Sequence, residues 1–440
     1  KVPSLEELKE KETLVKASQK ILNTLEYPTE QCKTISGLVE NGVAFHHAGL
    51  LQKQREVIEE NFRQGVIKII CSTTTLGAGI NLPAYRVLIP SIYRYTEIGN
   101  QPITVREYKQ LAGRAGRPAF HEDGQSVLFA RSELELDELM VNYVNGELES
   151  VSSKLGIEPI LRTHLLALIS SNFVFDLQSI EDFFSKTFYF KQFGSNKEFF
   201  QKITKLLSEL KDMGFVESND KRFYSTLLGR RVSELYLDPL SAFKMITSLK
   251  KNVQQEMAYL YILSNTSEMS PHFSVPRKAE GLLWGELEDY KTVLPIEVEK
   301  EMYFDTHLLK KFNTSLIFKE WVNETPEEKI SKDFGVQPGI MHSKKQIAEW
   351  LAYSCFELSK ILGLTFHLNP LDKLQKRIHH GVKEELVNLV ELRGIGRVRA
   401  RKMYNAGLRT ILDIKKIDVV DLQKIIPPAV ALKVKAQLKS

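Results

Sequence analysis

Two arginines three residues apart mark the stretch Gln110–Pro118, which reads QLAGRAGRP. Guanidinium groups are permanently charged and form forked hydrogen bonds, so Arg114 and Arg117 suit a shared anionic target such as a transferring phosphoryl group. Gly113 and Gly116 leave room for a close backbone approach. We expect a glycine-rich helix start that carries an arginine finger. Taken alone, the string is equally typical of a basic helix terminus or a turn.

Two further blocks lie upstream of this stretch. Residues 71–83 read CSTTTLGAGINLP and follow the apolar run VIKII at 66–70, whose branched residues are typical of a buried parallel strand. Residues 45–50 read FHHAGL. Because open parallel sheets bind ligands at the carboxyl ends of their strands, we expect Thr73 and Thr74 to hold a phosphate of a nucleic-acid backbone.

In their order and spacing, the three blocks resemble motifs IV, V and VI of the second RecA-like domain of superfamily-two helicases. The resemblance implies that Arg114 and Arg117 meet the γ-phosphate of ATP across an interdomain cleft. It implies further nucleotide contacts at Gln110, Gly77 and Asn81 and nucleic-acid contacts at His47, Thr73 and Thr74.

Composition permits a nucleic-acid partner without requiring one. The chain has 440 residues, enough for several domains, and its 60 Lys and Arg against 55 Asp and Glu give a net charge of only +5. Its three scattered cysteines predict a reducing compartment and neither a disulfide framework nor a metal site. The apolar runs are far shorter than the roughly 18 residues that span a bilayer, so we expect no membrane association.

The first 150 residues predict an α/β RecA-like domain. Helices are expected over 4–25 and 51–65, with a strand between them at 42–45. Two strand-like runs, 86–95 and 102–105, bracket Gly99-Asn100 and predict a hairpin. In the DNA-unwinding branch of the superfamily this insertion separates the duplex, and Tyr93 is then a candidate for base stacking.

Beyond residue 150 the pattern becomes mostly helical. Residues 151–228 predict a winged helix, with helices over 155–171, 177–188 and 197–213 and two short strands at 215–217 and 222–225. The third helix has a mixed charge pattern, which favours a structural, interdomain role over insertion into DNA.

Residues 229–370 predict a helical bundle. Gly335 and the Pro338-Gly339 pair interrupt it, and a helix is expected from 341 to 362. This region resembles the ratchet helix of archaeal superfamily-two DNA repair helicases, in which a tryptophan stacks on a base. The resemblance makes Trp350 the base contact, with its indole at the edge of the apolar stripe, and Lys344 or Lys345 the backbone contact.

Residues 371–440 predict a helix-hairpin-helix domain, because two helical runs are joined by Gly394-Ile395-Gly396. Such glycines expose backbone amides to a phosphate at a helix N-terminus. The neighbouring cations, among them Arg397, Arg399 and Arg401, have little packing value and are expected to grip one DNA strand.

The whole chain resembles the archaeal superfamily-two DNA helicases related to the helicase part of DNA polymerase theta. This implies an ATP- and Mg²⁺-dependent motor that moves 3′ to 5′ on single-stranded DNA and unwinds forks in repair and replication restart. A monomer is expected in the archaeal cytoplasm, associated with the nucleoid and with replication or repair proteins.

The sequence contains no Gly-x-x-x-x-Gly-Lys-Ser/Thr segment, and Asp137-Glu138 follows no buried strand. The chain is therefore expected to be a fragment that lacks the first RecA-like domain and is inactive alone. Two alternatives stay open: a related RNA helicase, and an ATP-independent DNA-binding scaffold.

Overall fold

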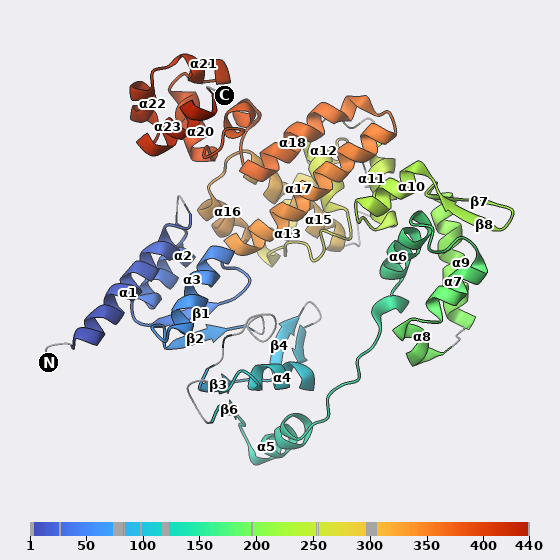
Figure 1. Cartoon of the computed structure of the whole chain (residues 1–440), viewed down its shortest axis with the longest axis horizontal. Coiled ribbons are helices and arrows are strands. Elements are labelled where there is room, and N and C mark those ends of the chain that lie inside the picture. Colours follow the sequence, from blue (N-terminus) through green and yellow to red (C-terminus); the bar gives the residue numbers. More distant parts are fainter. Residues whose placement is uncertain are drawn as a thin grey trace. The chain divides into compact units, whose positions relative to one another are not determined.

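The chain is described by a computed structural model over residues 4–25, 28–73, 82, 84–96, 99–116, 123–194, 197–251, 253, 255–295 and 306–438 (Figure 1). It divides into two compact units. The first comprises Lys1–Val151 and Gln337–Ile340, and the second comprises Ser152–Val336 and Met341–Ser440. Each unit has its own buried apolar core.

The first unit alternates helices with four-residue strands. Strands β1 and β2 form one parallel pair, β3 and β6 form another, and β4 and β5 form an antiparallel hairpin. Its elements are α1 (Leu5–Leu22), α2 (Glu30–Val39), β1 (Val43–His46), α3 (Gln52–Arg63), β2 (Ile69–Ser72), β3 (Arg86–Ile89), β4 (Tyr93–Thr96), β5 (Gly99–Pro102), α4 (Val105–Ala112), β6 (Gln125–Leu128), α5 (Glu133–Leu139) and the π-helix η2 (Met140–Val144).

Local sequence signals explain the helix ends in this unit. Ser4 accepts a hydrogen bond from the Glu7 amide while the Glu7 carboxylate accepts one from the Ser4 amide, a capping box that starts α1. Gly65, at φ +73°, follows the end of α3. In α3, Ile58 and Phe62 lie four residues apart on one face and are both buried. The strand and the helix predicted within residues 42–65 are confirmed as β1 and α3.

Two strand predictions in this unit are wrong in part. The apolar run at 66–70 was expected to be a buried strand, but β2 begins only at Ile69, and that side chain is 56% exposed. The run 86–95 was expected to be one strand, but it is divided into β3 and β4, because Pro90 has no N–H to donate. Gly99 and Asn100 were expected in the hairpin turn and instead belong to β5, opposite Thr96 and Tyr95.

The second unit is almost entirely helical, with one antiparallel hairpin formed by β7 and β8. Its elements are η3 (Lys154–Gly156), α6 (Glu158–Ser170), α7 (Leu177–Phe184), α8 (Phe188–Phe193), α9 (Lys197–Asp212), β7 (Val216–Asn219), β8 (Arg222–Ser225), α10 (Leu227–Glu234), α11 (Pro239–Leu249), α12 (Glu256–Ser264), η4 (Arg277–Ala279), α13 (Glu280–Tyr290), α15 (Thr306–Val322), α16 (Glu327–Phe334), α17 (Pro338–Ile361), η5 (Thr365–His367), α18 (Leu368–His380), η6 (Glu384–Leu386), α19 (Val387–Val390), α20 (Arg397–Asn405), α21 (Ile411–Lys416), α22 (Val419–Ile425) and α23 (Pro428–Gln437).

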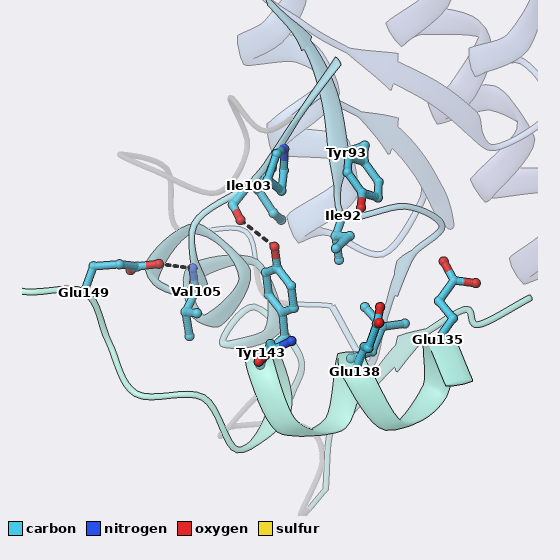
Figure 2. A pocket seen from close by; sticks show the side chains of 11 residues that line it. Ile92, Tyr93, Ile103, Val105, Glu135, Glu138, Tyr143 and Glu149 are labelled. Atoms are coloured by element: carbon cyan, nitrogen blue, oxygen red, sulfur yellow. Dashed lines mark hydrogen bonds between the residues drawn. The ribbon is translucent and has the colours of Figure 1, made fainter. Parts of the chain in front are cut away.

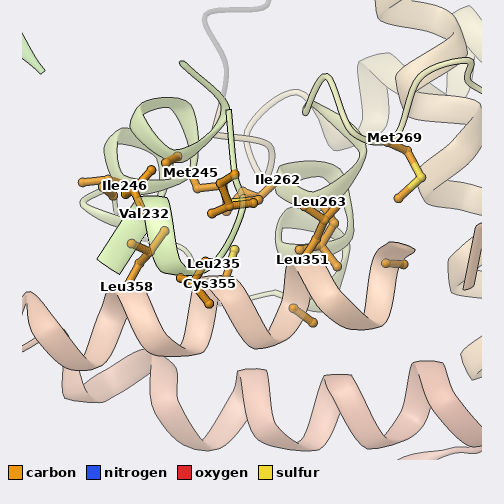
Figure 3. Packing of buried hydrophobic residues seen from close by; sticks show 14 of the residues in the cluster. Val232, Leu235, Met245, Ile246, Ile262, Leu263, Met269, Leu351, Cys355 and Leu358 are labelled. Carbon is orange, nitrogen blue, oxygen red and sulfur yellow. The ribbon is translucent and has the colours of Figure 1, made fainter. Parts of the chain in front are cut away.

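Helix α17 supplies one side of the largest core. Leu351, Cys355 and Leu358 share one face at helical spacing and are completely buried (Figure 3). Figure 3 shows them packed against side chains of α10, α11 and α12 such as Val232 and Met245. The sequence predicted the helix but not its start, since Pro338 occupies the first turn of α17, where proline is tolerated.

Helices α19 to α23 enclose a separate core. The Gly394-Ile395-Gly396 link joins α19 to α20 as expected: Gly394 has φ +88°, and Gly396 precedes the first residue of α20. Ile395 is buried between them, so the link is anchored in this core. The positive φ at position 394 is a backbone conformation that favours glycine.

Candidate nucleotide and nucleic-acid sites

Arg114 follows the end of α4, so the expected helix start is in fact a helix end. The amide of Gly113 donates to the Lys109 carbonyl at 2.9 Å and completes the last turn. The backbone then leaves the helix: the Arg114 carbonyl accepts from the Ala84 amide at 2.9 Å, and the Gly116 amide donates to the Ala84 carbonyl at 2.7 Å. These bonds fix the backbone on either side of the predicted finger.

The other predicted nucleotide contacts are only partly described. Gln110 is exposed on the last turn of α4. Arg117, Gly77 and Asn81 lie outside the described residues, as does the predicted DNA contact Thr74.

Thr73 and His47 lie at the carboxyl ends of the paired strands β2 and β1. Thr73 is exposed, and its amide donates to the His46 carbonyl at 3.3 Å. The Gly49 amide donates to Nδ1 of His47 at 3.0 Å, and the ring stacks on Phe45 with centroids 5.4 Å apart. Burial, followed by the adjacent His46, lowers the pKa of His47. His47 therefore suits a neutral hydrogen-bonding role better than a charged contact to phosphate.

Tyr93 lies at the base of the β4-β5 hairpin, beside a pocket of about 300 Å³ (Figure 2). The opposite wall comes from α5 and η2, where the Tyr143 hydroxyl donates to the Ile103 carbonyl at 2.8 Å. Burial, and then the charges of Tyr93 and Glu149, raise the pKa of Tyr143. Glu135 and Glu138 also line this pocket, so its electrostatics oppose a DNA phosphate. Base stacking by the outer face of Tyr93 stays a prediction.

The predicted contacts on α17 are more buried than the sequence indicated. The Trp350 indole was expected to be free at the edge of the stripe, but it is partly buried and its Nε1–H donates to the Leu235 carbonyl at 3.1 Å. Lys344 is 7% exposed and donates to the Met269 carbonyl, and burial lowers its pKa. Lys344 thus has a structural role in this arrangement.

Lys345 and Arg397 approach the same buried ring. The Lys345 Nζ lies 5.2 Å from the centroid of Trp321, and the Arg397 guanidinium carbon lies 4.8 Å from it. The Trp321 Nε1–H donates to the Ile378 carbonyl at 2.7 Å. A side chain at Gly381 would come within 2.6 Å of the ring, which explains the glycine there.

Arg401 docks the terminal helices on the bundle. Its guanidinium forms a forked pair with the Glu324 carboxylate at 2.8 and 2.7 Å and a further bond to Glu385 at 2.8 Å. The hydrogen bond from Glu324 is the largest of the effects that raise the pKa of Arg401. Glu324 also accepts from the Lys383 amide at 3.0 Å.

The expectation that these cations have little packing value is therefore wrong for Arg397 and Arg401. Arg399 donates to the Gly394 carbonyl at 2.8 Å, within its own hairpin. Sequence analysis missed Trp321 and Glu324 as their partners. The residue types alone hinted at the contact between Arg397 and Trp321, because arginine often stacks on tryptophan. No sequence spacing, however, links positions 321 and 397.

In the described part of the chain, no group of three or more His, Cys, Asp or Glu side chains is placed to hold a metal ion. None of the helices described is both long and apolar enough to cross a membrane.

Comparison with known proteins assigns two segments. Residues 4–119 match the helicase conserved C-terminal domain, a span that contains all three motif blocks. Residues 257–381 match domain 4 of archaeal helicases, a span that contains Trp321 and all of α17.

Similar proteins extend the match over most of the chain. It is 35% identical to the ATP-dependent DNA helicase Hel308 of Methanococcus vannielii over 91% of its own length and 58% of the relative's. It is 35% identical to Hel308 of Pyrococcus horikoshii, covering 91% and 56%, and 37% identical to Hel308 of Pyrobaculum calidifontis, covering 89% and 55%. The chain thus spans somewhat more than half the length of these relatives. The chain is therefore similar over about nine-tenths of its own length to archaeal ATP-dependent DNA helicases named Hel308.

Proposed function

We propose that this chain is the C-terminal part of an ATP-dependent DNA helicase that moves 3′ to 5′ on single-stranded DNA and unwinds forks. Residues 4–119 match the helicase conserved C-terminal domain, and the similar proteins are named ATP-dependent DNA helicases. The match of residues 4–119 is the observation that carries the proposal. In the intact protein, a first RecA-like domain supplies the main contacts to ATP and Mg²⁺. Arg114 and Arg117 then complete the site from this chain, with Gln110, Gly77 and Asn81 nearby.

Three modules follow the RecA-like domain in this proposal. Residues 151–228 form a winged helix in an interdomain role, 229–370 a ratchet bundle, and 371–440 a helix-hairpin-helix domain. The helices α6 to α9 and the β7-β8 hairpin support the first, and the Gly394-Ile395-Gly396 link supports the last.

Single-stranded DNA is proposed to contact Thr73, Thr74, His47 and Tyr93 in the first unit. In the second unit it contacts Lys345, the outer face of Trp350 and the amides around Gly394 and Gly396. Because Lys344, Arg397 and Arg401 bond within the protein, the exposed Arg393 and Lys402 beside this link are the better candidates for phosphate contacts. The working form is a monomer in the cytoplasm, at the nucleoid, with replication or repair proteins as partners.

Strand displacement tests this proposal. The intact protein should release the labelled strand of a forked DNA duplex with a 3′ single-stranded tail when ATP and Mg²⁺ are present. A duplex with only a 5′ tail should not be unwound. A preference for the matched RNA fork would favour the RNA helicase alternative. DNA binding with no ATP hydrolysis would favour the scaffold.

A further inference from the structure

The link between α10 and α11 carries a tyrosine in a backbone conformation that tyrosine rarely adopts. Tyr236 has φ +59°, in the left-handed region, where a residue with a β-carbon is strained. Its side chain is exposed, with Tyr236 83% accessible to solvent, so core packing does not explain the residue. At the ends of α16 and α18 the residue with positive φ is a glycine, Gly335 and Gly381. In the described part of the chain, Tyr236 is the one aromatic residue with a positive φ.

The turn that contains Tyr236 is a Schellman motif, which requires this conformation. The Tyr236 amide donates to the Ser233 carbonyl at 3.0 Å. The Leu237 amide donates to the Val232 carbonyl at 3.3 Å, and both of these side chains are buried in the same core. Glycine is the usual residue at the left-handed position of the motif, because it has no β-carbon. A tyrosine there lowers stability relative to glycine, which points to a use for its ring.

Tyr236 adjoins the tryptophan of α17. The Trp350 indole donates to the carbonyl of Leu235, which Figure 3 shows next to Cys355 of α17, at 3.1 Å. Because a carbonyl oxygen and the next Cα belong to one planar peptide unit, the Cα of Tyr236 lies within about 6 Å of the Trp350 Nε1. Tyr353 follows Trp350 by three residues, on the same side of α17, and is 38% exposed. Three aromatic side chains thus gather where α10 meets α17.

The cations of this surface are paired with carboxylates. Arg231 donates to Glu234 at 2.9 Å and to Glu357 at 2.8 Å. It also donates to the Tyr353 hydroxyl at 3.4 Å, which orients that ring. The neighbouring Arg230 lies 3.5 Å from Glu234. The surface therefore offers aromatic faces rather than unbalanced positive charge, and it suits stacking on bases better than a grip on phosphates.

We propose that Tyr236 is a base-stacking residue for single-stranded DNA, next to the contact proposed for Trp350. Every base has a π-face, so adjacent tyrosine and tryptophan rings bind a single strand without reading its sequence. The turn holds the Tyr236 ring out of the core, where it adds a second stacking surface beside the indole. The inference rests on the proposed function, because it requires that single-stranded DNA passes over α17.

Tyr236→Gly is the main test, because DNA affinity and stability should change in opposite directions. In the 440-residue chain it should weaken the binding of a fluorescein-labelled oligothymidylate by about 5- to 150-fold, the loss expected for one stacked base. Fluorescence anisotropy measures this loss. The same variant should raise the urea midpoint of the helical unit, because glycine relieves the strain. Tyr236→Phe keeps the ring and should retain the affinity of the parent within about twofold.

A matched control and a salt series identify the kind of contact. Phe366 is also an exposed aromatic residue, 62% accessible, on η5 beyond the end of α17. Phe366→Ala should leave the affinity for the oligonucleotide unchanged. The fold-loss in Tyr236→Gly should be the same at about 50 and 300 mM salt, because stacking releases no counterions, whereas the loss of a phosphate contact shrinks as salt rises.

The outcomes separate this inference from the proposed function. If the parent chain binds the oligonucleotide and Tyr236→Gly binds it equally well, Tyr236 is no base contact and the proposed function stands. The same result would be expected if Tyr236 packs on a second copy of the chain or on a segment of the intact protein. A lower urea midpoint together with weaker binding would assign the loss to a disturbed turn and would also overturn the inference. A parent chain without affinity for single-stranded DNA would overturn both proposals.

Discussion

Helix α17 of the helical unit buries its apolar face, whereas strands β2 and β3 of the α/β unit leave apolar side chains exposed. Leu351 and Leu358 of α17 are completely buried in one continuous core, while Leu88 of β3 is 54% exposed. All three motif blocks lie in the α/β unit. The difference teaches that a region can be rich in functional motifs and still expose apolar strand residues, whereas α17 encloses its apolar face in a continuous core.

The largest expected effect is on ATP hydrolysis, and it tests whether Arg117 of the α/β unit acts on a nucleotide that another domain mainly binds. Arg117→Ala in the intact protein should lower DNA-stimulated ATPase activity by about 10³-fold or more, because an arginine finger supplies roughly 10³ to 10⁵ in rate. A phosphate-release assay measures it, and single-strand affinity should not change. Arg131→Ala, at an exposed position outside the motif, is the control. Activity within about tenfold of the parent would refute the role.

Alanine substitutions in the two units compare their packing directly. Leu351→Ala should destabilise the helical unit by about 2 to 5 kcal/mol, because it removes fully buried methyl groups and leaves a cavity. Leu88→Ala in the 440-residue chain should change stability by no more than about 0.5 kcal/mol, because the side chain is exposed. Urea unfolding monitored separately for the two units provides the measurement. A similar cost for both variants would break the comparison.

The pH dependence of stability tests the burial of His380 in the helical unit. Burial, with the charges of His379 and Lys345 next, lowers the pKa of His380 to about 4. An unfolded histidine titrates near 6.5, so between about pH 4 and 6.5 the unfolded chain binds more protons than the folded one. Stability from this group is therefore complete above about pH 6.5 and falls by about 1 to 3 kcal/mol as the pH drops towards 4.

His380→Gln should flatten this part of the stability profile of the helical unit. His164→Gln, at an exposed position on α6, should leave the slope as in the parent protein. The check is urea unfolding at several pH values from 4 to 7. A slope that survives His380→Gln would assign the titration to another group.

The smallest effect concerns the hydrogen bond between α17 and the end of α10. Trp350→Phe keeps an aromatic face but loses the donor to the Leu235 carbonyl, at a cost of about 1 kcal/mol in stability. Single-strand affinity should then change little, whereas Trp350→Ala should weaken it by about 1 to 3 kcal/mol through lost stacking. Fluorescence anisotropy with a labelled oligonucleotide distinguishes the variants. Unchanged affinity in Trp350→Ala would exclude the base contact.

Several features of the fold could be predicted because they depend on neighbours in sequence. Helical spacing of apolar residues, with Gly65 as the stop, predicted α3. Apolar periodicity likewise predicted α17, whose Leu351 and Leu358 are buried. The Gly394-Ile395-Gly396 link was likewise predictable from a few adjacent residues. The exposure of Ile69 in β2 was not predictable, since the burial of a strand depends on the elements that pack against it in the tertiary structure.

The sequence by itself determined the motif blocks, several helix ends such as that of α3, and the alternation of strands and helices, because these depend on interactions within a few residues. Only the tertiary structure decided what the charged and aromatic side chains do. It paired Arg401 with Glu324, placed Arg397 over Trp321, and joined the indole of Trp350 to Leu235. These partners are separated by 76 to 115 residues in the chain, and no local pattern encodes such distant contacts. The charge or aromatic ring of a side chain follows from the residue type, but the residue that it contacts is decided by the fold.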